Sequence, residues 1–212
     1  MGTSGDLTNP GLSPIGILIL LVMSVLTWIL PRNRALVPLF LTACYIPLGQ
    51  SIVVAGANFQ FLRILLLVGW CRAMVHHEAA GMKFTRMDKL FLGWCLATIL
   101  IGSFAWRSEF SHRVVSQCGT VYTAAGTYFL VRWWIRDLDE MIDIVRILAW
   151  MILPLALSMI IEKFTSRNMF AIFGGVPEFT FVREGKLRCQ GAFRNPLLAG
   201  AFGATLFALV TG

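Results

Sequence analysis

Seven long apolar runs, separated by short polar segments, constrain the fold of this chain more than any other feature. They cover residues 14–31, 35–54, 59–75, 90–106, 114–135, 141–161 and 196 onward. An α-helix rises about 1.5 Å per residue, so about 18 to 20 apolar residues cross the roughly 30 Å hydrocarbon layer of a bilayer. We therefore expect an all-α, polytopic integral membrane protein with about seven transmembrane helices.

The composition supports this expectation. Apolar residues make up 57% of the 212 residues and charged residues only 14%, against roughly 25% charged residues in soluble domains. A single soluble core is thereby excluded. The net charge of +7 could point to nucleic acid, but the basic residues are scattered between apolar runs instead of forming one patch. We expect membrane lipids, and no nucleic acid, around the protein.

The first apolar run is expected to form a continuous helix, whereas the second contains two internal prolines. Residues 14–31 follow a segment without basic residues and lack a small-residue cleavage site, so we interpret them as a permanent helix and not as a signal peptide. In the second run, Pro38 and Pro47 would bend or shorten a helix. A re-entrant hairpin is therefore an alternative to a full membrane span at residues 35–54.

The orientation follows from the basic residues in the short connections, because cytoplasmic loops carry an excess of Lys and Arg. The opposite connections contain only Arg107 and Arg113, with Arg63 just inside the third apolar run. We expect the alternate, basic connections to face the cytoplasm and the N-terminus to lie outside. The nine basic residues of these connections are Arg32, Arg34, Arg72, Lys83, Arg86, Lys89, Arg132, Arg136 and Arg146.

On this topology the chain divides into three parts. Residues 1–161 form a bundle of six transmembrane helices, residues 162–195 a basic external loop, and residues 196–212 the start of a truncated transmembrane helix. The loop has three more basic than acidic residues, and a long loop can escape the positive-inside bias. It is therefore either a solvated loop or an anion site. Its charged residues are Lys163, Arg167, Arg183, Lys186, Arg188 and Arg194, against Glu162, Glu178 and Glu184.

The second half of this loop favours the anion site. Four cations, Arg183, Lys186, Arg188 and Arg194, precede a predicted helix in which Asn195 can cap and Pro196 can take the first position. Backbone donors and the positive end of the helix dipole would then point to where the cations gather. Arginine binds phosphate oxygens in a bidentate manner without a metal. Arg63 either extends to the membrane surface or faces the same external cavity.

Other polar groups have structural explanations. Asp137, Asp139 and Glu140 resemble the acidic metal-binding element of some glycosyltransferases, but Asp137 and Glu140 have the spacing of a helix cap. Asp143 and Arg146 lie one turn apart on the same helix face. We therefore expect no metal and no cofactor. The histidines and cysteines lack metal-ligand spacing: His76, His77, His112, Cys44, Cys71, Cys95, Cys118 and Cys189.

Two short patterns resemble a known family. One is Arg188-x-x-Gly191-x-Phe193-x-Asn195-Pro196 after about six helices, and the other is the turn at 47–50 followed by residues 61–64. They resemble the O-antigen ligase and Wzy-type O-antigen polymerase superfamily, in particular its exopolysaccharide branch. The resemblance implies a helical bundle of the GT-C type in the bacterial inner membrane.

The activity that the resemblance implies is metal-independent glycosyl transfer. Such an enzyme moves a glycan from a polyprenyl-pyrophosphate carrier to a glycan or lipid acceptor on the external face. Arg188 corresponds to a family arginine that contacts the carrier phosphates. A second large external loop, with an arginine and a histidine, is expected later in the family. The last apolar run stops at Gly212, so we expect an N-terminal part, inactive alone, whose catalytic residues are unknown. The alternative is a transporter of a lipid-linked substrate or a structural membrane subunit.

Overall fold

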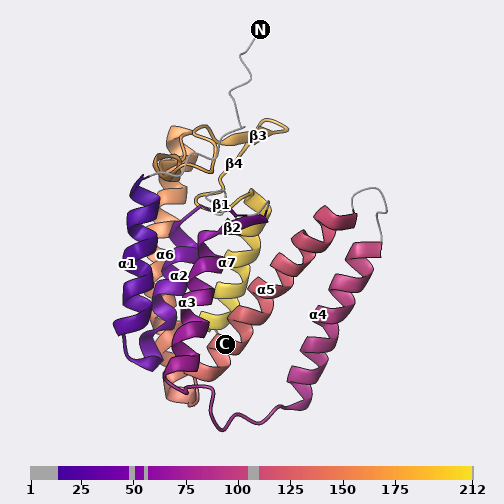
Figure 1. Ribbon diagram of the computed structural model, residues 1–212. Helices are drawn as coiled ribbons and strands as arrows, with labels where there is room; N and C mark the ends of the chain where they lie inside the picture. Colours follow the sequence, from indigo (N-terminus) through magenta and orange to yellow (C-terminus); the bar gives the residue numbers. More distant parts are fainter. Residues whose placement is uncertain (1–13, 48–50, 55–56, 105–109, 212) are drawn as a thin grey trace.

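The computed structural model describes residues 14–47, 51–54, 57–104 and 110–211, and this part of the chain is mostly helical (Figure 1). Seven α-helices run alternately up and down. They are α1 (Pro14–Ile29), α2 (Leu36–Tyr45), α3 (Phe61–Val75), α4 (Arg86–Phe104), α5 (Phe110–Trp134), α6 (Leu138–Thr165) and α7 (Pro196–Thr211). Each expected apolar run overlaps one of these helices, so the hydropathy pattern predicted their order correctly.

Two short antiparallel hairpins interrupt the helices, so the all-α expectation is wrong in detail. Strand β1 (Ser51–Val54) pairs with β2 (Ala57–Gln60) between α2 and α3. Strand β3 (Phe181–Arg183) pairs with β4 (Lys186–Arg188) between α6 and α7. Two 3₁₀ turns, Arg32–Arg34 and Met169–Phe173, complete the connections.

The second apolar run is not a continuous helix. Helix α2 has only ten residues, with Pro38 in its first turn and Pro47 two residues after its end. Proline is tolerated in the first turn of a helix, where no backbone bond is lost, and it cannot continue a helix that has ended. The prolines shorten this helix, as expected, while a single span over residues 35–54 is wrong. Apolar residues 52–54 lie in β1 instead.

Two clusters of buried side chains hold the helices together. The larger cluster joins α1, α2, α3, α5 and α6 around Leu36, Leu65, Leu130 and Trp134. The smaller one joins the end of α2 to α6, α7 and the segment between α6 and α7. Helix α4 packs against α5 at the edge of the bundle, and this pair extends to one side (Figure 1).

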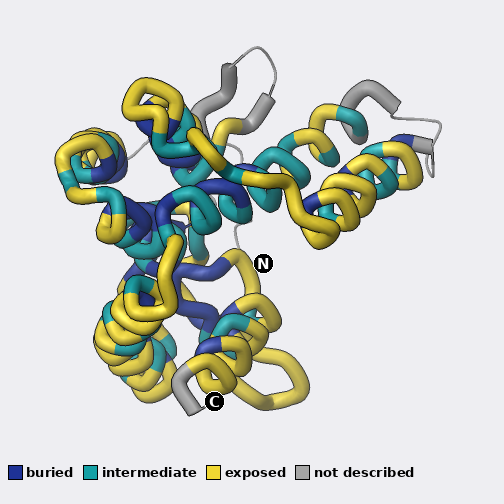
Figure 2. The backbone as a smooth tube through the Cα atoms, turned by 90° about the horizontal axis from the view of Figure 1, so that it is seen from below, coloured by how far each residue is buried: buried dark blue, intermediate teal, exposed yellow. Residues whose placement is uncertain are grey.

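The outer surfaces of the helices are strongly apolar. Large side chains such as Leu18 of α1, Ile101 of α4, Trp150 of α6 and Phe207 of α7 are exposed. Seen along the bundle, the buried segments face inward and the exposed segments line the outside (Figure 2). Of the described helices, only α6 is both long enough and apolar enough to cross a membrane; α1 and α7 are apolar but shorter.

The connections divide between the two ends of the bundle (Figure 1). One end, called the basal end below, holds the 3₁₀ turn Arg32–Arg34 and the connections at 76–85 and 135–137. The other end holds the β1–β2 hairpin and the segment 166–195, called the α6–α7 loop below. The three basic connections identified in the sequence therefore lie together, opposite the long basic loop.

Candidate anion-binding loop

The α6–α7 loop is anchored by one buried carboxylate. Glu162, in the last turn of α6, is only 1% exposed. Its Oε2 accepts a hydrogen bond from the backbone N–H of Gly191 at 2.9 Å. Its Oε1 accepts from the backbone N–H of Gln190 at 3.2 Å and from the hydroxyl of Thr180 at 3.2 Å. Because a buried charge is tolerated only when it is well hydrogen-bonded, these three donors make Glu162 a fixed anchor.

A second polar side chain completes the anchor. The amide nitrogen of Asn168 donates to the carbonyl of Gly191 at 2.8 Å, and its Oδ1 accepts from the backbone N–H of Phe170 at 2.9 Å. Phe170 and Phe193 are buried against Leu155 of α6. Gly191 has φ of +59°, a left-handed conformation that glycine adopts readily. Gly191, three residues after Arg188, is therefore held at both its backbone N–H and its carbonyl.

The β3–β4 hairpin gathers three of the four predicted cations. Its register pairs Phe181 with Arg188 and Arg183 with Lys186. Neighbouring side chains of a strand point to opposite faces, so these four residues share one face. Val182 and Leu187, which pair with each other, share the other.

The hairpin turn explains why these cations meet. Glu184 and Gly185 both have positive φ, +55° and +72°, as a two-residue type I′ turn requires. The sequence analysis missed this hairpin. The two-residue turn Glu184-Gly185, flanked by the apolar residues Val182 and Leu187, was the available signal.

The cations of the loop differ in their surroundings. Arg183 is 63% exposed and lies 3.7 Å from the carboxylate of Glu184. Arg188 is half-buried, whereas Lys186 and Arg194 are exposed. Within the described part of the chain, the side chains of Lys186, Arg188 and Arg194 make no hydrogen bond or ion pair. Their donors therefore remain available to an anion.

The start of α7 confirms the predicted cap but not the predicted set of backbone donors. The Oδ1 of Asn195 accepts from the backbone N–H of Leu198 at 2.9 Å, and Pro196 is the first helical residue. Pro196 has no N–H, and the N–H of Ala199 bonds to the carbonyl of Asn195. Only the N–H of Leu197 is left in this first turn, so an anion here must rely on side chains.

Arg63 is held between two helices. It lies in the first turn of α3, and its Nε donates to the hydroxyl of Thr123 on α5 at 3.3 Å. A Cβ on Gly119 would lie 2.6 Å from its Nη1, so the guanidinium fills the space that this glycine leaves. The hydroxyl of Tyr122 donates to the carbonyl of Arg63 at 3.2 Å. Pairing with α5 is thus the observed role of Arg63, and a contact with the loop's anion stays a prediction.

A buried aspartate at the basal end was missed by the sequence analysis. Asp88 is fully buried and accepts hydrogen bonds from the backbone N–H of Thr85 at 2.6 Å and from the hydroxyl of Tyr128 at 2.8 Å. It also forms an ion pair with Arg132. Thr85 and Asp88 form a reciprocal capping box at the start of α4. Their spacing before an apolar run was the signal that could have revealed it.

A second buried charge cluster joins α1, α3 and α5. The guanidinium of Arg72 donates to the carbonyl of Thr27 and, at 3.2 Å, to Glu78. The indole N–H of Trp134 donates to the other oxygen of Glu78 at 2.6 Å, and Arg72 lies over the Trp134 ring at 5.5 Å. These bonds tie α1, α3 and α5 together through the ion pair of Arg72 and Glu78.

The acidic stretch at the start of α6 caps the helix differently from the prediction. The side chain of Asp137, the cap residue, forms no capping bond. Instead, Glu140 accepts from the backbone N–H of Arg136 at 2.9 Å and from Arg32 at 3.0 Å. The expected pair of Asp143 with Arg146 is present at 3.3 Å. Among the described residues, no three His, Cys, Asp or Glu side chains lie close enough together to hold a metal ion.

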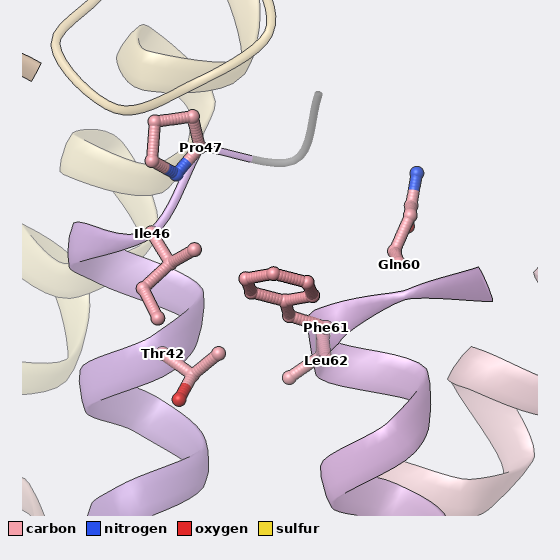
Figure 3. Close-up of a pocket in the computed structure, with 6 residues that line it drawn as sticks. All are labelled: Thr42, Ile46, Pro47, Gln60, Phe61 and Leu62. Carbon is pink, nitrogen blue, oxygen red and sulfur yellow. The ribbon is translucent and has the colours of Figure 1, made fainter. Parts of the chain in front are cut away.

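A small pocket near the start of α3 lies apart from the cations. It has a volume of about 10 Å³ and lies between the end of α2 and the start of α3. Figure 3 shows Phe61 and Leu62 facing Thr42 and Ile46 across it. Its lining is mostly apolar and lacks a charged group, so it offers nothing to hold an anion.

Comparison with family models, curated proteins and solved structures gave no match for this chain.

Proposed function

We propose that this chain is an integral membrane protein whose seven helices lie in a bacterial inner membrane. The support is the exposed apolar surface of α1, α4, α6 and α7, because soluble monomers rarely expose large continuous apolar patches. Helix α1 has 16 residues, about 24 Å at the usual rise. A span of this length is accommodated by local thinning of the bilayer.

The proposed orientation places the basal end in the cytoplasm and the α6–α7 loop outside. It is supported by the grouping of the three basic connections at one end of the bundle (Figure 1). The membrane potential and the insertion machinery favour Lys and Arg on the cytoplasmic side. The cations of the α6–α7 loop lie in a long loop, which can escape this bias, and the role that we propose for them is to bind an anionic ligand.

The proposed activity is that of the N-terminal part of a glycan ligase or polymerase, which takes a glycan from a polyprenyl-pyrophosphate carrier. The observation that carries this proposal is the β3–β4 hairpin, which puts Arg183, Lys186 and Arg188 on one face. A pyrophosphate group carries several negative oxygens, and Arg188 has a free guanidinium fork to bind two of them.

In this proposal the cations act on the leaving group. When the acceptor attacks the sugar carbon with inversion, negative charge develops on the departing polyprenyl pyrophosphate. Fixed cations beside those oxygens stabilise the transition state without a metal. The hydrogen bond between Glu162 and Gly191 holds the backbone close to Arg188 in place before the carrier binds. The group that activates the acceptor is expected in a later external loop of the full-length protein.

Ligand binding by the full 212-residue chain in lipid nanodiscs tests this proposal. We expect a short-chain polyprenyl pyrophosphate to bind, and Arg188→Ala to weaken it about tenfold or more, the usual effect of losing a charged hydrogen bond. Arg188→Lys should weaken it almost as much, because lysine lacks the fork. Arg167→Ala is the matched control, since Arg167 lies in the same loop and is 68% exposed. Unchanged affinity in Arg188→Ala would refute the assignment.

A further inference from the structure

The β3–β4 hairpin projects from the α6–α7 loop with both faces uncovered. Phe181 on one face is 57% exposed and Val182 on the other is 56% exposed. A lone two-stranded hairpin is only marginally stable in water. Another surface is therefore needed to cover it in the working protein.

The residues on the two faces of the hairpin indicate what kind of surface would cover it. Arg183, Lys186 and Arg188 on one face require negative charge, while Val182 and Leu187 on the other require an apolar environment. These two environments are separated by only the thickness of a single strand pair. In a lipid bilayer, anionic headgroups and hydrocarbon chains meet within a similarly short distance.

The flanking residues extend the same pattern. Phe164, Ile172 and Phe179 of the neighbouring segments are all exposed. Phe is among the apolar side chains with which amphipathic segments bury one face at the level of the lipid headgroups. Peripheral segments with one apolar and one basic face lie in this layer, with the apolar face about 5 to 10 Å deep.

We propose that the β3–β4 hairpin lies in the headgroup layer of an anionic bilayer, with Val182 and Leu187 toward the acyl chains and the three cations at the lipid phosphates. This inference rests on the proposed membrane location and not on glycan transfer. The three cations then lie at the depth of the lipid headgroups, where the pyrophosphate of a polyprenyl carrier also lies. Basic residues near an anionic surface are attracted to it.

A fluorescent reporter on the hairpin tests the proposal. Val182→Cys is prepared in the full chain with Cys71, Cys118 and Cys189 replaced by Ser, and it is labelled with an environment-sensitive dye. The protein is placed in nanodiscs of phosphatidylcholine with or without phosphatidylglycerol, containing nitroxide-labelled lipids. We expect blue-shifted emission that is quenched best by nitroxides near the headgroups. Quenching should be stronger with phosphatidylglycerol, and Arg183→Gln with Lys186→Gln should remove that difference.

Two control positions distinguish a failure of the hairpin proposal from a failure of the proposed membrane location. A dye at Glu184→Cys, in the turn, should be quenched less than one at Val182→Cys. A dye at Trp150→Cys reports the membrane itself, because Trp150 on α6 is 70% exposed. Quenching at position 150 without quenching at 182 would overturn the hairpin proposal, as would equal quenching in the two lipid mixtures. Absence of quenching at both positions would overturn the membrane location.

Discussion

The carboxylate of Glu162 and the backbone N–H of Gly191 are joined by a hydrogen bond of 2.9 Å, across 29 residues of sequence. This bond ties the end of α6 to the segment that leads into α7. Arg188 lies three residues before Gly191, so the position of its backbone follows from this anchor. The base of the loop is thus fixed to α6, although the β3–β4 hairpin itself is exposed.

Replacing Glu162 with Gln should loosen the loop. The amide keeps the shape of the side chain, but its nitrogen cannot accept the hydrogen bond from Gln190 or Gly191. An unsatisfied buried group costs about 1 to 3 kcal/mol. Hydrogen exchange should show faster exchange at residues 190 and 191. Glu178→Gln is the control, because Glu178 is 60% exposed; equal acceleration in both variants would contradict the anchor.

The thiol of Cys189 should report the same anchor. Burial and the nearby Glu162 carboxylate raise the pKa of Cys189 above its ordinary value of 9.0, against an opposing effect of Lys163. A raised pKa leaves less thiolate at a given pH, and the thiolate is the reactive form. Alkylation of Cys189 should therefore reach half of its maximal rate at a higher pH than alkylation of an ordinary exposed thiol. Glu162→Gln should shift this midpoint down, and an unchanged midpoint would count against the proposed proximity.

Asp88→Asn should be among the most destabilising single changes at the basal end. It leaves Arg132 without its buried partner and weakens the bond to Tyr128. Breaking one side of a buried ion pair costs about 3 to 5 kcal/mol. Tyr128→Phe should cost only about 1 kcal/mol. Thermal unfolding in detergent measures both, with Asp143→Asn as the exposed control; equal melting temperatures for the two aspartate variants would contradict the prediction.

Two glycines of α5 should respond oppositely to alanine. At Gly119 a Cβ would lie 2.6 Å from Nη1 of Arg63, so the guanidinium must move away from Thr123. At Gly126 the nearest atoms would lie 3.5 Å away, an ordinary contact. Alanine in a helix is more stable than glycine by about 1 kcal/mol. Gly126→Ala should raise the melting temperature and Gly119→Ala should lower it; a rise in both would show that Arg63 moves freely.

The positions of the helices could be predicted because hydropathy senses long apolar runs. It could not show that the second run changes from α2 to β1, since Ile52 and Val53 are as apolar in a strand as in a helix. The hairpin that gathers Arg183 and Lys186 depends on two positive φ angles in its turn. Such backbone angles are difficult to predict from amino-acid composition.

Only those parts of the candidate site that depend on neighbouring residues could be predicted from the sequence. Asn195 and Pro196 follow local capping rules, which can be recognised from neighbouring residues. Glu162 appeared in the sequence only as one of three loop acids, because its partners at 190 and 191 are backbone groups that every residue carries. At the start of α6, spacing alone could not tell that Glu140 and not Asp137 supplies the bond.

On the proposed membrane location, the position of Arg72 bears on the order in which the helices are inserted during synthesis. An arginine within a helix resists transfer from the translocon into lipid unless its charge is compensated. Arg72 donates to the carbonyl of Thr27 and to Glu78, and both partners have been synthesised before α4 emerges. Helices α1, α2 and α3 pack against one another. In the proposed membrane these three helices can therefore be inserted together, and Trp134 of α5 completes the cluster of Arg72 and Glu78 when the α4–α5 pair is added.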